Sequence, residues 1–186
     1  MHRNLLRQLL ASYPITYPDD RIHRDQVEKF VENYPQCFER SLSVGHITGS
    51  AWVVSPDRTR ILLTHHKKLN RWLQLGGHAD GNPDVFAVAL REAKEESGLK
   101  NIRPLSRQIF DIDAHPIPAT PTEARHHHYD IRFIFEAEPA ETLIISSESK
   151  DLAWVETTAL PRLGVDQSVL RMAQKAQAAF PRQNPQ

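Results

Sequence analysis

The spacing of apolar residues divides the chain into a short helical part and a longer part dominated by strands. The leucines of residues 5–10 recur with the period of a helix, and a second apolar stripe follows in residues 19–33. Prolines lie at the ends of both stripes, where a helix has to stop or start. We therefore expect an N-terminal helical extension over residues 1–43, ahead of a domain over residues 44–186.

Short strands are the main pattern of this second part. β-branched and aliphatic runs at 46–55 and 60–66 flank the turn sequence PDRT, which predicts a hairpin. Further strands are predicted at 71–78, 107–117, 127–138 and 151–160. Since the helices and strands do not alternate regularly, the order indicates an α+β fold with a mixed β-sheet rather than a doubly wound fold.

Two helices are expected among these strands. One spans residues 82–97, with Asn82 as its N-cap and Pro83 as its first helical residue. The other spans residues 166–180, with Asp166 as its N-cap. Both carry apolar residues on one side, which is typical of a helix packed on a sheet.

The composition argues against several classes of protein. Lys and Arg number 23, as do Asp and Glu, so the net charge of zero gives no support to a nucleic-acid or membrane-surface partner. A single cysteine, Cys37, excludes an internal disulfide and fits a reducing compartment. The N-terminal apolar run is too short for a secretory signal, and no stretch approaches the roughly 18 apolar residues of a membrane span. We expect a cytoplasmic protein.

The stretch REAKEESG at residues 91–98 places three glutamates on one stripe of the predicted helix. Glu92, Glu95 and Glu96 have helical spacings of three and four, at which like charges cost about 0.2–0.5 kcal/mol per pair. A hard divalent cation such as Mg²⁺ would turn this repulsion into attraction, because it prefers carboxylate oxygens together with substrate phosphates. A solvated helix face with ion pairs to Arg91 and Lys94 would explain the glutamates equally well.

The residues around this stripe resemble the Nudix box of MutT-like hydrolases. The pattern of that box is Gly, five residues, Glu, seven residues, Arg-Glu, an aliphatic, any residue, Glu-Glu, any residue, Gly and an aliphatic. The matching positions here are Gly77, Arg91, Glu92, Ala93, Glu95, Glu96, Gly98 and Leu99. The first glutamate of the box is replaced by Pro83, and either of the flanking residues Asp80 and Asp84 could substitute for it. The resemblance covers about residues 45–175 and implies a Nudix-type α/β/α sandwich.

The resemblance also implies an activity and a metal. Nudix enzymes hydrolyse a nucleoside diphosphate linked to another group, with Mg²⁺ or Mn²⁺ as cofactor. Carried over to this chain, Glu92 and Glu96 would be the main metal ligands, and Glu95 an added ligand or an acceptor behind them. The carbonyl of Gly77 would complete the site, and Arg91 would brace the glutamates by ion pairing.

A further carboxylate is expected from a loop. In many members of this family such a group precedes a late strand and serves as metal ligand or general base. Glu148 is the first choice for this role and Asp151 the second. An exposed loop acid without a function is the alternative for both.

Histidines form a second group of polar residues. His126, His128 and Arg132 alternate along the predicted strand 127–138, on the face opposite its aromatic residues, so we expect them to point toward solvent or a cleft. His115 would approach them if the strand at 107–117 pairs with this one. Three interpretations stay open: a polar strand edge, a substrate-binding surface, and a transition-metal site.

Two basic residues lie close to the glycine pair in sequence. Lys67 and Arg71 precede it by several residues, and side chains of this kind hold phosphate oxygens in many sites. We interpret them as substrate-binding candidates. A solvated surface turn is the alternative.

Two other functions are compatible with the sequence. A Nudix-fold protein that binds or senses a ligand without catalysis is one, since Pro83 departs from the box. An enzyme similar to isopentenyl diphosphate isomerase is the other, but it would need a catalytic cysteine, and Cys37 lies in the helical extension. The N-terminal helices could cover one side of the domain, shape the pocket or form a homodimer contact. The identity of the nucleotide or other diphosphate substrate is not given by the sequence.

Overall fold

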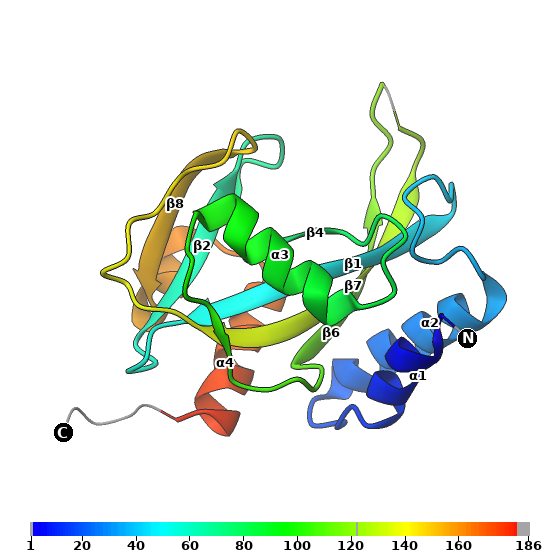
Figure 1. The fold of residues 1–186 in the computed structure, drawn as a ribbon, viewed down its shortest axis with the longest axis horizontal. Helices are drawn as coiled ribbons and strands as arrows, with labels where there is room; N and C mark the ends of the chain where they lie inside the picture. Colours follow the sequence, from blue (N-terminus) through cyan, green and yellow to red (C-terminus); the bar gives the residue numbers. More distant parts are fainter. Residues whose placement is uncertain (1, 122, 182–186) are drawn as a thin grey trace. The chain divides into compact units, whose positions relative to one another are not determined.

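A computed structural model describes residues 2–121 and 123–181 (Figure 1). Its helices are α1 (Asn4–Ala11), α2 (Pro18–Asn33), α3 (Val85–Ser97), α4 (Gln167–Ala179) and the short 3-10 helix η1 (Thr157–Leu163). Its strands are β1 (Gly45–Val54), β2 (Arg60–His66), β3 (Arg71–Leu73), β4 (Leu75–His78), β5 (Arg103–Pro104), β6 (Asp111–Ile117), β7 (His126–Glu136) and β8 (Ser149–Glu156). Among the described residues, no helix has the length and apolarity needed to cross a membrane.

The strands form one sheet in the order β3-β2-β1-β7-β5, with β4 paired to β1, β6 to β7 and β8 to β2. The predicted hairpin is confirmed, since β1 and β2 pair antiparallel with Val53 opposite Leu62. The predicted strand at 71–78 is divided at Gln74 into β3 and β4, because β3 pairs with β2 and β4 pairs with β1. The expected α+β architecture, a mixed β-sheet with flanking helices, is confirmed.

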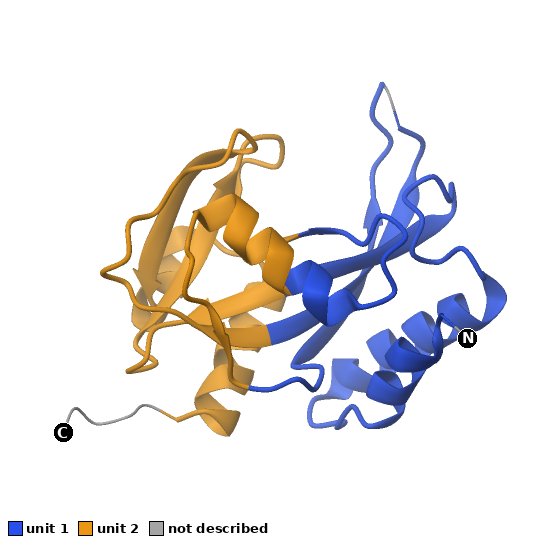
Figure 2. Ribbon diagram, viewed as in Figure 1, with its two compact units in different colours: residues 1–50, 77–89, 106–133 blue, residues 51–76, 90–105, 134–186 orange. Residues whose placement is uncertain are grey.

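The chain divides into two compact units (Figure 2). Unit 1 comprises residues 1–50, 77–89 and 106–133, and unit 2 comprises residues 51–76, 90–105 and 134–186. Strands β1, β4 and β7 and helix α3 contribute residues to both units. The predicted boundary between residues 43 and 44 does not coincide with this division and stays a prediction.

The two N-terminal helices pack together within unit 1, and α2 also contacts β6. The ring of Phe30 on α2 stacks on Tyr129 of β7 with centroids 3.9 Å apart. Asp20 fixes the start of α2, because its carboxylate accepts hydrogen bonds from the N–H of Tyr17 at 2.8 Å and from the hydroxyl of Tyr13 at 2.9 Å. Both predicted helices are therefore confirmed, and Pro18 begins the second one.

Helix α3 begins later than its sequence suggested. Asp84 is its capping residue, since Oδ1 of Asp84 accepts a hydrogen bond from the N–H of Ala87 at 3.0 Å. The prediction that Asn82 caps the helix and that Pro83 is its first residue is wrong, because the helix starts at Val85. The first turn of α3 packs closely on β1, because Val85 and Val88 lie against Gly49. A Cβ added to Gly49 would come within 3.1 Å of atoms of both valines.

The other end of α3 requires a glycine. Gly98 follows the helix with a φ of +72°, and its N–H donates to the carbonyl of Lys94 at 2.8 Å. A Cβ at this position would lie 2.6 Å from Cβ of Ile144. Helix α4 begins as predicted, since Asp166 accepts a hydrogen bond from the N–H of Val169 at 3.0 Å. The predicted strand 151–160 ends at Glu156, where η1 takes over.

Candidate functional site

The three glutamates of α3 differ in how far they are exposed to solvent. Glu96 is 8% exposed, and the Glu92 side chain is 15% exposed, whereas the Glu95 side chain is 59% exposed. All three belong to unit 2. The alternative of a solvated helix face therefore fits Glu95. It does not fit Glu96, because the side chain of Glu96 is buried.

Glu96 is oriented by the backbone of β4. The N–H of Gly76 donates a hydrogen bond of 2.9 Å to Oε2 of Glu96. Burial, together with the charges of Glu92 and Glu148, nevertheless outweighs the effect of the Gly76 amide and raises the pKa of Glu96 to about 7. Burial and the neighbouring carboxylates both disfavour the charged form of Glu96. A bound cation would stabilise that charged form.

Arg91 and Glu95 modify the environment of Glu92. Burial raises the pKa of Glu92, the Arg91 guanidinium opposes this, and the charge of Glu95 adds to the rise. Arg91 lies 2.7 Å from Oε1 of Glu92 and 2.9 Å from Oε2 of Glu95. The ion pairing expected of Arg91 is therefore present, and its effect is to hold two of the glutamates in place.

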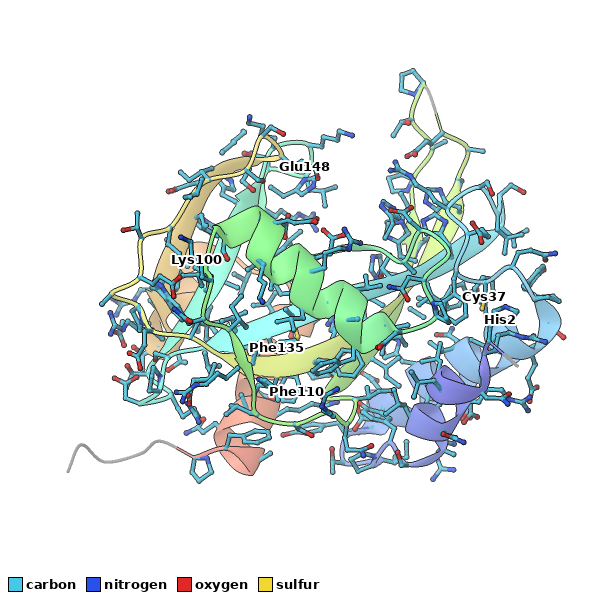
Figure 3. All side chains as sticks on the ribbon, viewed as in Figure 1. His2, Cys37, Lys100, Phe110, Phe135 and Glu148 are labelled. Carbon is cyan, nitrogen blue, oxygen red and sulfur yellow. The ribbon has the colours of Figure 1, made fainter. Side chains whose placement is uncertain are left out.

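Glu148 lies in the turn that precedes β8 (Figure 3). Its side chain is exposed, and its charge contributes to the raised pKa of both Glu92 and Glu96. The backbone of Lys67 donates to the carbonyl of Glu148 at 3.0 Å, and Nζ of Lys67 donates to the carbonyl of Ser147 at 2.7 Å. Lys67 therefore holds the turn that carries Glu148. Arg71, at the start of β3, is exposed.

Arg132 of β7 is buried in unit 1, not directed at solvent or a cleft as its strand face suggested. Its guanidinium nitrogens lie 2.7 Å from Asp130, 3.0 Å from Asp111 and 3.5 Å from Asp113. Burial lowers the pKa of Arg132, but the three aspartates outweigh burial and raise it above its ordinary value. The hydroxyls of Thr48 and Ser50 donate to Oδ1 of Asp130 at 2.8 Å each.

This contact pattern gives Arg132 a structural part in the sheet. Its side chain is 2% exposed, so a ligand has little access to it. The expectation that Arg132 points toward solvent or a cleft is wrong, because aspartates of β6 and β7 surround its guanidinium.

Histidines from several strands gather in unit 1. His115 and His128 stand opposite each other in the β6–β7 pair with ring centroids 5.8 Å apart, and the rings of His126 and His128 are 5.1 Å apart. His46 of β1 and His78 of β4 belong to the same group, and the centroids of their rings are 4.9 Å apart. Neither of these two residues was among the sequence-predicted site residues, because β1, β4 and β7 come together only through the pairing of the sheet. The only signal was the position of His78 directly after the glycine pair.

Residues 46–175 match the family model of the NUDIX domain. The chain belongs to the Nudix family. The match covers more than two thirds of the sequence, and the expected Nudix-type α/β/α sandwich is therefore confirmed. A comparison with curated protein sequences found no match.

Solved structures of Nudix proteins share the fold. A binary complex of the Ap4A hydrolase of C. elegans superposes with a TM-score of 0.58 at 14% identity, over 72% of this chain and 96% of that one. A NUDIX-family hydrolase from Clostridium perfringens has a TM-score of 0.56 at 28% identity, over 73% of this chain and 97% of that one. The NUDIX domain of Shewanella oneidensis NrtR, complexed with ADP ribose, has a TM-score of 0.50 at 16% identity, over 82% of this chain and 97% of that one.

The departure from the Nudix box at Pro83 leaves the remaining glutamates of the box in place. Pro83 lies two residues ahead of α3, and Oδ1 of Asp84 is engaged in capping that helix. Asp84 therefore acts on the helix backbone, and we do not assign it the role of the missing glutamate. Glu92, Glu95 and Glu96 all lie within α3 itself.

Cys37 does not have the character of a catalytic thiol. It is buried, and burial raises the pKa of its thiol to about 11 (Figure 3). A nucleophilic cysteine needs a lowered pKa and access to its substrate. Within the Nudix family, this favours the hydrolase over the isomerase-like alternative.

Proposed function

We propose that this Nudix protein is a hydrolase that uses Mg²⁺ or Mn²⁺ to cleave the diphosphate bond of a nucleoside diphosphate linked to another group. The observation that carries the proposal is the state of Glu96. It is buried, its described hydrogen bond comes from a backbone amide, and its pKa is raised to about 7. A bound divalent cation would supply the positive charge that Glu96 lacks and would add to the partial compensation that Arg91 gives Glu92.

The chemistry of the donors supports the choice of metal. Glu92 and Glu96 would be the main ligands, with Glu95 and Glu148 added to them. The Nudix box also assigns a carbonyl ligand at Gly77, the residue that follows Gly76 in the chain. These are all oxygen donors, which suit Mg²⁺ and Mn²⁺ rather than a softer metal. When bound, such an ion neutralises the diphosphate and lowers the pKa of the attacking water.

The remaining residues of unit 2 would position the turn and the substrate. Arg91 restrains Glu92 and Glu95 through ion pairs. Lys67 restrains the turn of Glu148 through the carbonyl of Ser147. We propose that Glu148 is the additional ligand or general base and that the exposed Arg71 binds phosphate oxygens of the substrate. The similar structure from C. elegans is that of an Ap4A hydrolase, and this supports a nucleotide as the class of substrate.

The proposal is tested by a hydrolysis screen with Mg²⁺ and with Mn²⁺. The substrates are nucleoside triphosphates, nucleotide sugars, ADP-ribose, dinucleoside polyphosphates and CDP-alcohols. Glu92→Gln and Glu96→Gln should each lower turnover at least about a hundredfold with the fold intact by circular dichroism, because one metal ligand is lost. Glu32→Gln on the exposed surface of α2 is the matched control and should retain full activity.

Two results would contradict the proposal. Full activity in both Glu92→Gln and Glu96→Gln would remove the glutamates from catalysis. No turnover of any substrate by protein that binds Mg²⁺ in calorimetry would instead favour the non-catalytic ligand-binding alternative.

A further inference from the structure

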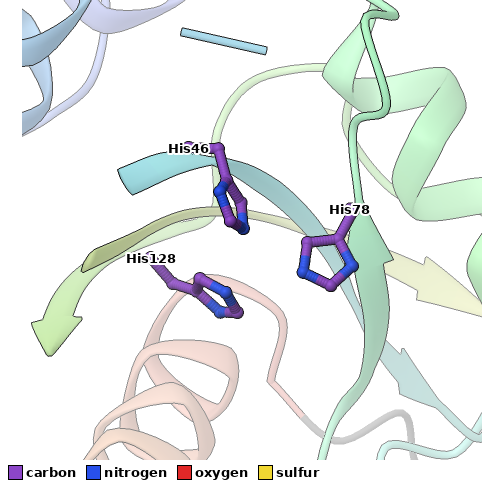
Figure 4. Close-up of side chains that lie close together, drawn as sticks. All are labelled: His46, His78 and His128. Atoms are coloured by element: carbon purple, nitrogen blue, oxygen red, sulfur yellow. The ribbon is translucent and has the colours of Figure 1, made fainter. Parts of the chain in front are cut away.

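Three histidines of unit 1 converge from three different strands. His46 lies on β1, His78 on β4 and His128 on β7, and each offers a ring nitrogen within 4.8 Å of the others. Their ring centroids are 4.8–5.2 Å apart, and Figure 4 shows the three rings turned toward a common space. None of these residues belongs to the glutamate group of α3.

His46 is the least satisfied member of this group. It is 3% exposed, and neither of its ring nitrogens makes a hydrogen bond of normal geometry among the described residues. The backbone of Leu42 acts on it only as the smallest of the influences on its pKa. Buried polar side-chain atoms in folded proteins nearly always have a partner. An unpartnered imidazole that faces two others is therefore a sign of a missing ligand at this point.

The electrostatic environment keeps these rings neutral. Burial, with a smaller effect of the neighbouring histidines, lowers the pKa of His46 to about 4 and that of His128 to about 2. Burial also lowers the pKa of His78. Arg40 acts in the same direction on His46 and His78, but it is itself paired with Glu123 at 2.9 Å. Neutral imidazole is the form that binds a metal.

His126 has a ring orientation that would provide a fourth nitrogen. Its Nδ1 lies 2.9 Å from the carbonyl oxygen of Ala124, which can only accept, so Nδ1 carries the proton and Nε2 has the lone pair. This Nε2 lies 3.3 Å from Nε2 of His128. Four nitrogens arranged as a tetrahedron at about 2.0–2.1 Å from a zinc ion are about 3.3 Å apart.

We propose that His46, His78 and His128 bind one transition-metal ion, that His126 is the fourth ligand, and that the ion is Zn²⁺. Imidazole nitrogen suits Zn²⁺ and disfavours the hard cations that the glutamates attract. A tetrahedral ion with four protein ligands is typical of a structural site. It would join β1, β4 and β7 through their side chains, and it would give the nitrogens of His46 a partner.

The test is a zinc titration of the full chain, prepared without a histidine tag and freed of metal by chelation. A chromophoric indicator that competes for Zn²⁺ should report one equivalent bound. His46→Ala, His78→Ala and His128→Ala should each weaken binding at least about tenfold, because one ligand is removed. His127→Ala is the matched control, since His127 lies on the same strand with an exposed side chain, and it should bind like the wild type.

A second measurement needs no variant. Co²⁺ added to the metal-free wild type should give the strong visible absorption of a tetrahedral ion. The double variant Glu92→Gln/Glu96→Gln should give the same spectrum, because the glutamates take no part in this site. Absence of stoichiometric binding, a weak octahedral spectrum, or equal losses in His127→Ala and the three histidine variants would each overturn the proposal. None of these readouts depends on hydrolysis, so the site is tested separately from the proposed activity.

Discussion

The N–H of Gly76 and Oε2 of Glu96 are joined by a hydrogen bond of 2.9 Å between a strand and the last turns of a helix. An amide carries only a partial charge, so it orients the carboxylate without compensating fully for burial. The pKa of Glu96 accordingly stays raised at about 7. This single relationship leads to a measurable dependence of stability on pH.

Metal-free Glu96→Gln should become more stable relative to the wild type as the pH rises from about 5 to about 8. The folded state holds a proton on Glu96 up to a pKa of about 7, whereas the unfolded state loses it near the ordinary value of 4.5. The wild type therefore loses stability across this window, by up to about 3 kcal/mol, and glutamine cannot titrate. Thermal melts of both proteins with EDTA at each pH measure the difference, in which the other groups cancel. A difference that stays constant from pH 5 to pH 8 would contradict the assignment.

The histidines should produce the opposite dependence. Burial lowers the pKa of His128 to about 2, so the folded state resists a proton that the unfolded state binds near 6.5. The stability due to neutral His128 is therefore present above pH 6.5 and is lost as the pH falls below it. Metal-free wild type should lose more stability between pH 7 and pH 5 than His128→Gln does. Calorimetric or urea unfolding at both pH values checks this, and equal losses in the two proteins would refute it.

Arg132→Met should destabilise the protein strongly. The change leaves Asp111, Asp113 and Asp130 buried without their cation, and the removal of one partner from a buried ion group costs about 3–5 kcal/mol. Arg7→Met removes an exposed arginine that lies 3.7 Å from Glu32 and should cost no more than about 1 kcal/mol. Urea unfolding of both variants provides the comparison. Equal costs would show that the buried network contributes little.

Gly98→Ala should be more destabilising than Gly164→Ala. Both glycines have a positive φ, +72° and +64°, at which a Cβ costs about 1–2 kcal/mol per residue. An added Cβ at Gly98 also meets Cβ of Ile144 at 2.6 Å, whereas nothing lies within 4 Å at Gly164. The difference between the two free energies of unfolding therefore isolates the steric contact. If Gly164→Ala were the costlier change, the contact with Ile144 would have no energetic weight.

Local features of the chain were predictable from the sequence. The glutamate spacing of α3 and the β1–β2 hairpin depend on residues close in sequence or on strand alternation. The approach of His115 to His128 was predicted only on the condition that their strands pair, which they do. The start of α3 was not predictable, because Asn82 and Asp84 are both good capping residues and only the backbone path selects between them. Alternation also shows which residues share a face, but not what covers that face.

The site in unit 1 was predictable only in part for the same reason. Arg132 was placed on the correct strand face, yet its aspartates come from two strands and its burial depends on both. The histidine group includes His46 and His78, which are separated by more than thirty residues in the chain. No periodicity connects such positions, because they meet only when the order of the strands is known.

The aspartates around Arg132 also have a consequence for how the strands find each other during folding. In the native register Arg132 faces Asp111 across the β6–β7 ladder, and Asp113 faces Asp130. A slip by one residue would turn every side chain of one strand to the opposite face. Asp111 and Asp113 on β6 would then lie on the opposite face from Arg132, which would keep only Asp130 of its own strand as a partner. We therefore expect the network to favour the native register of this strand pair over a register shifted by one residue.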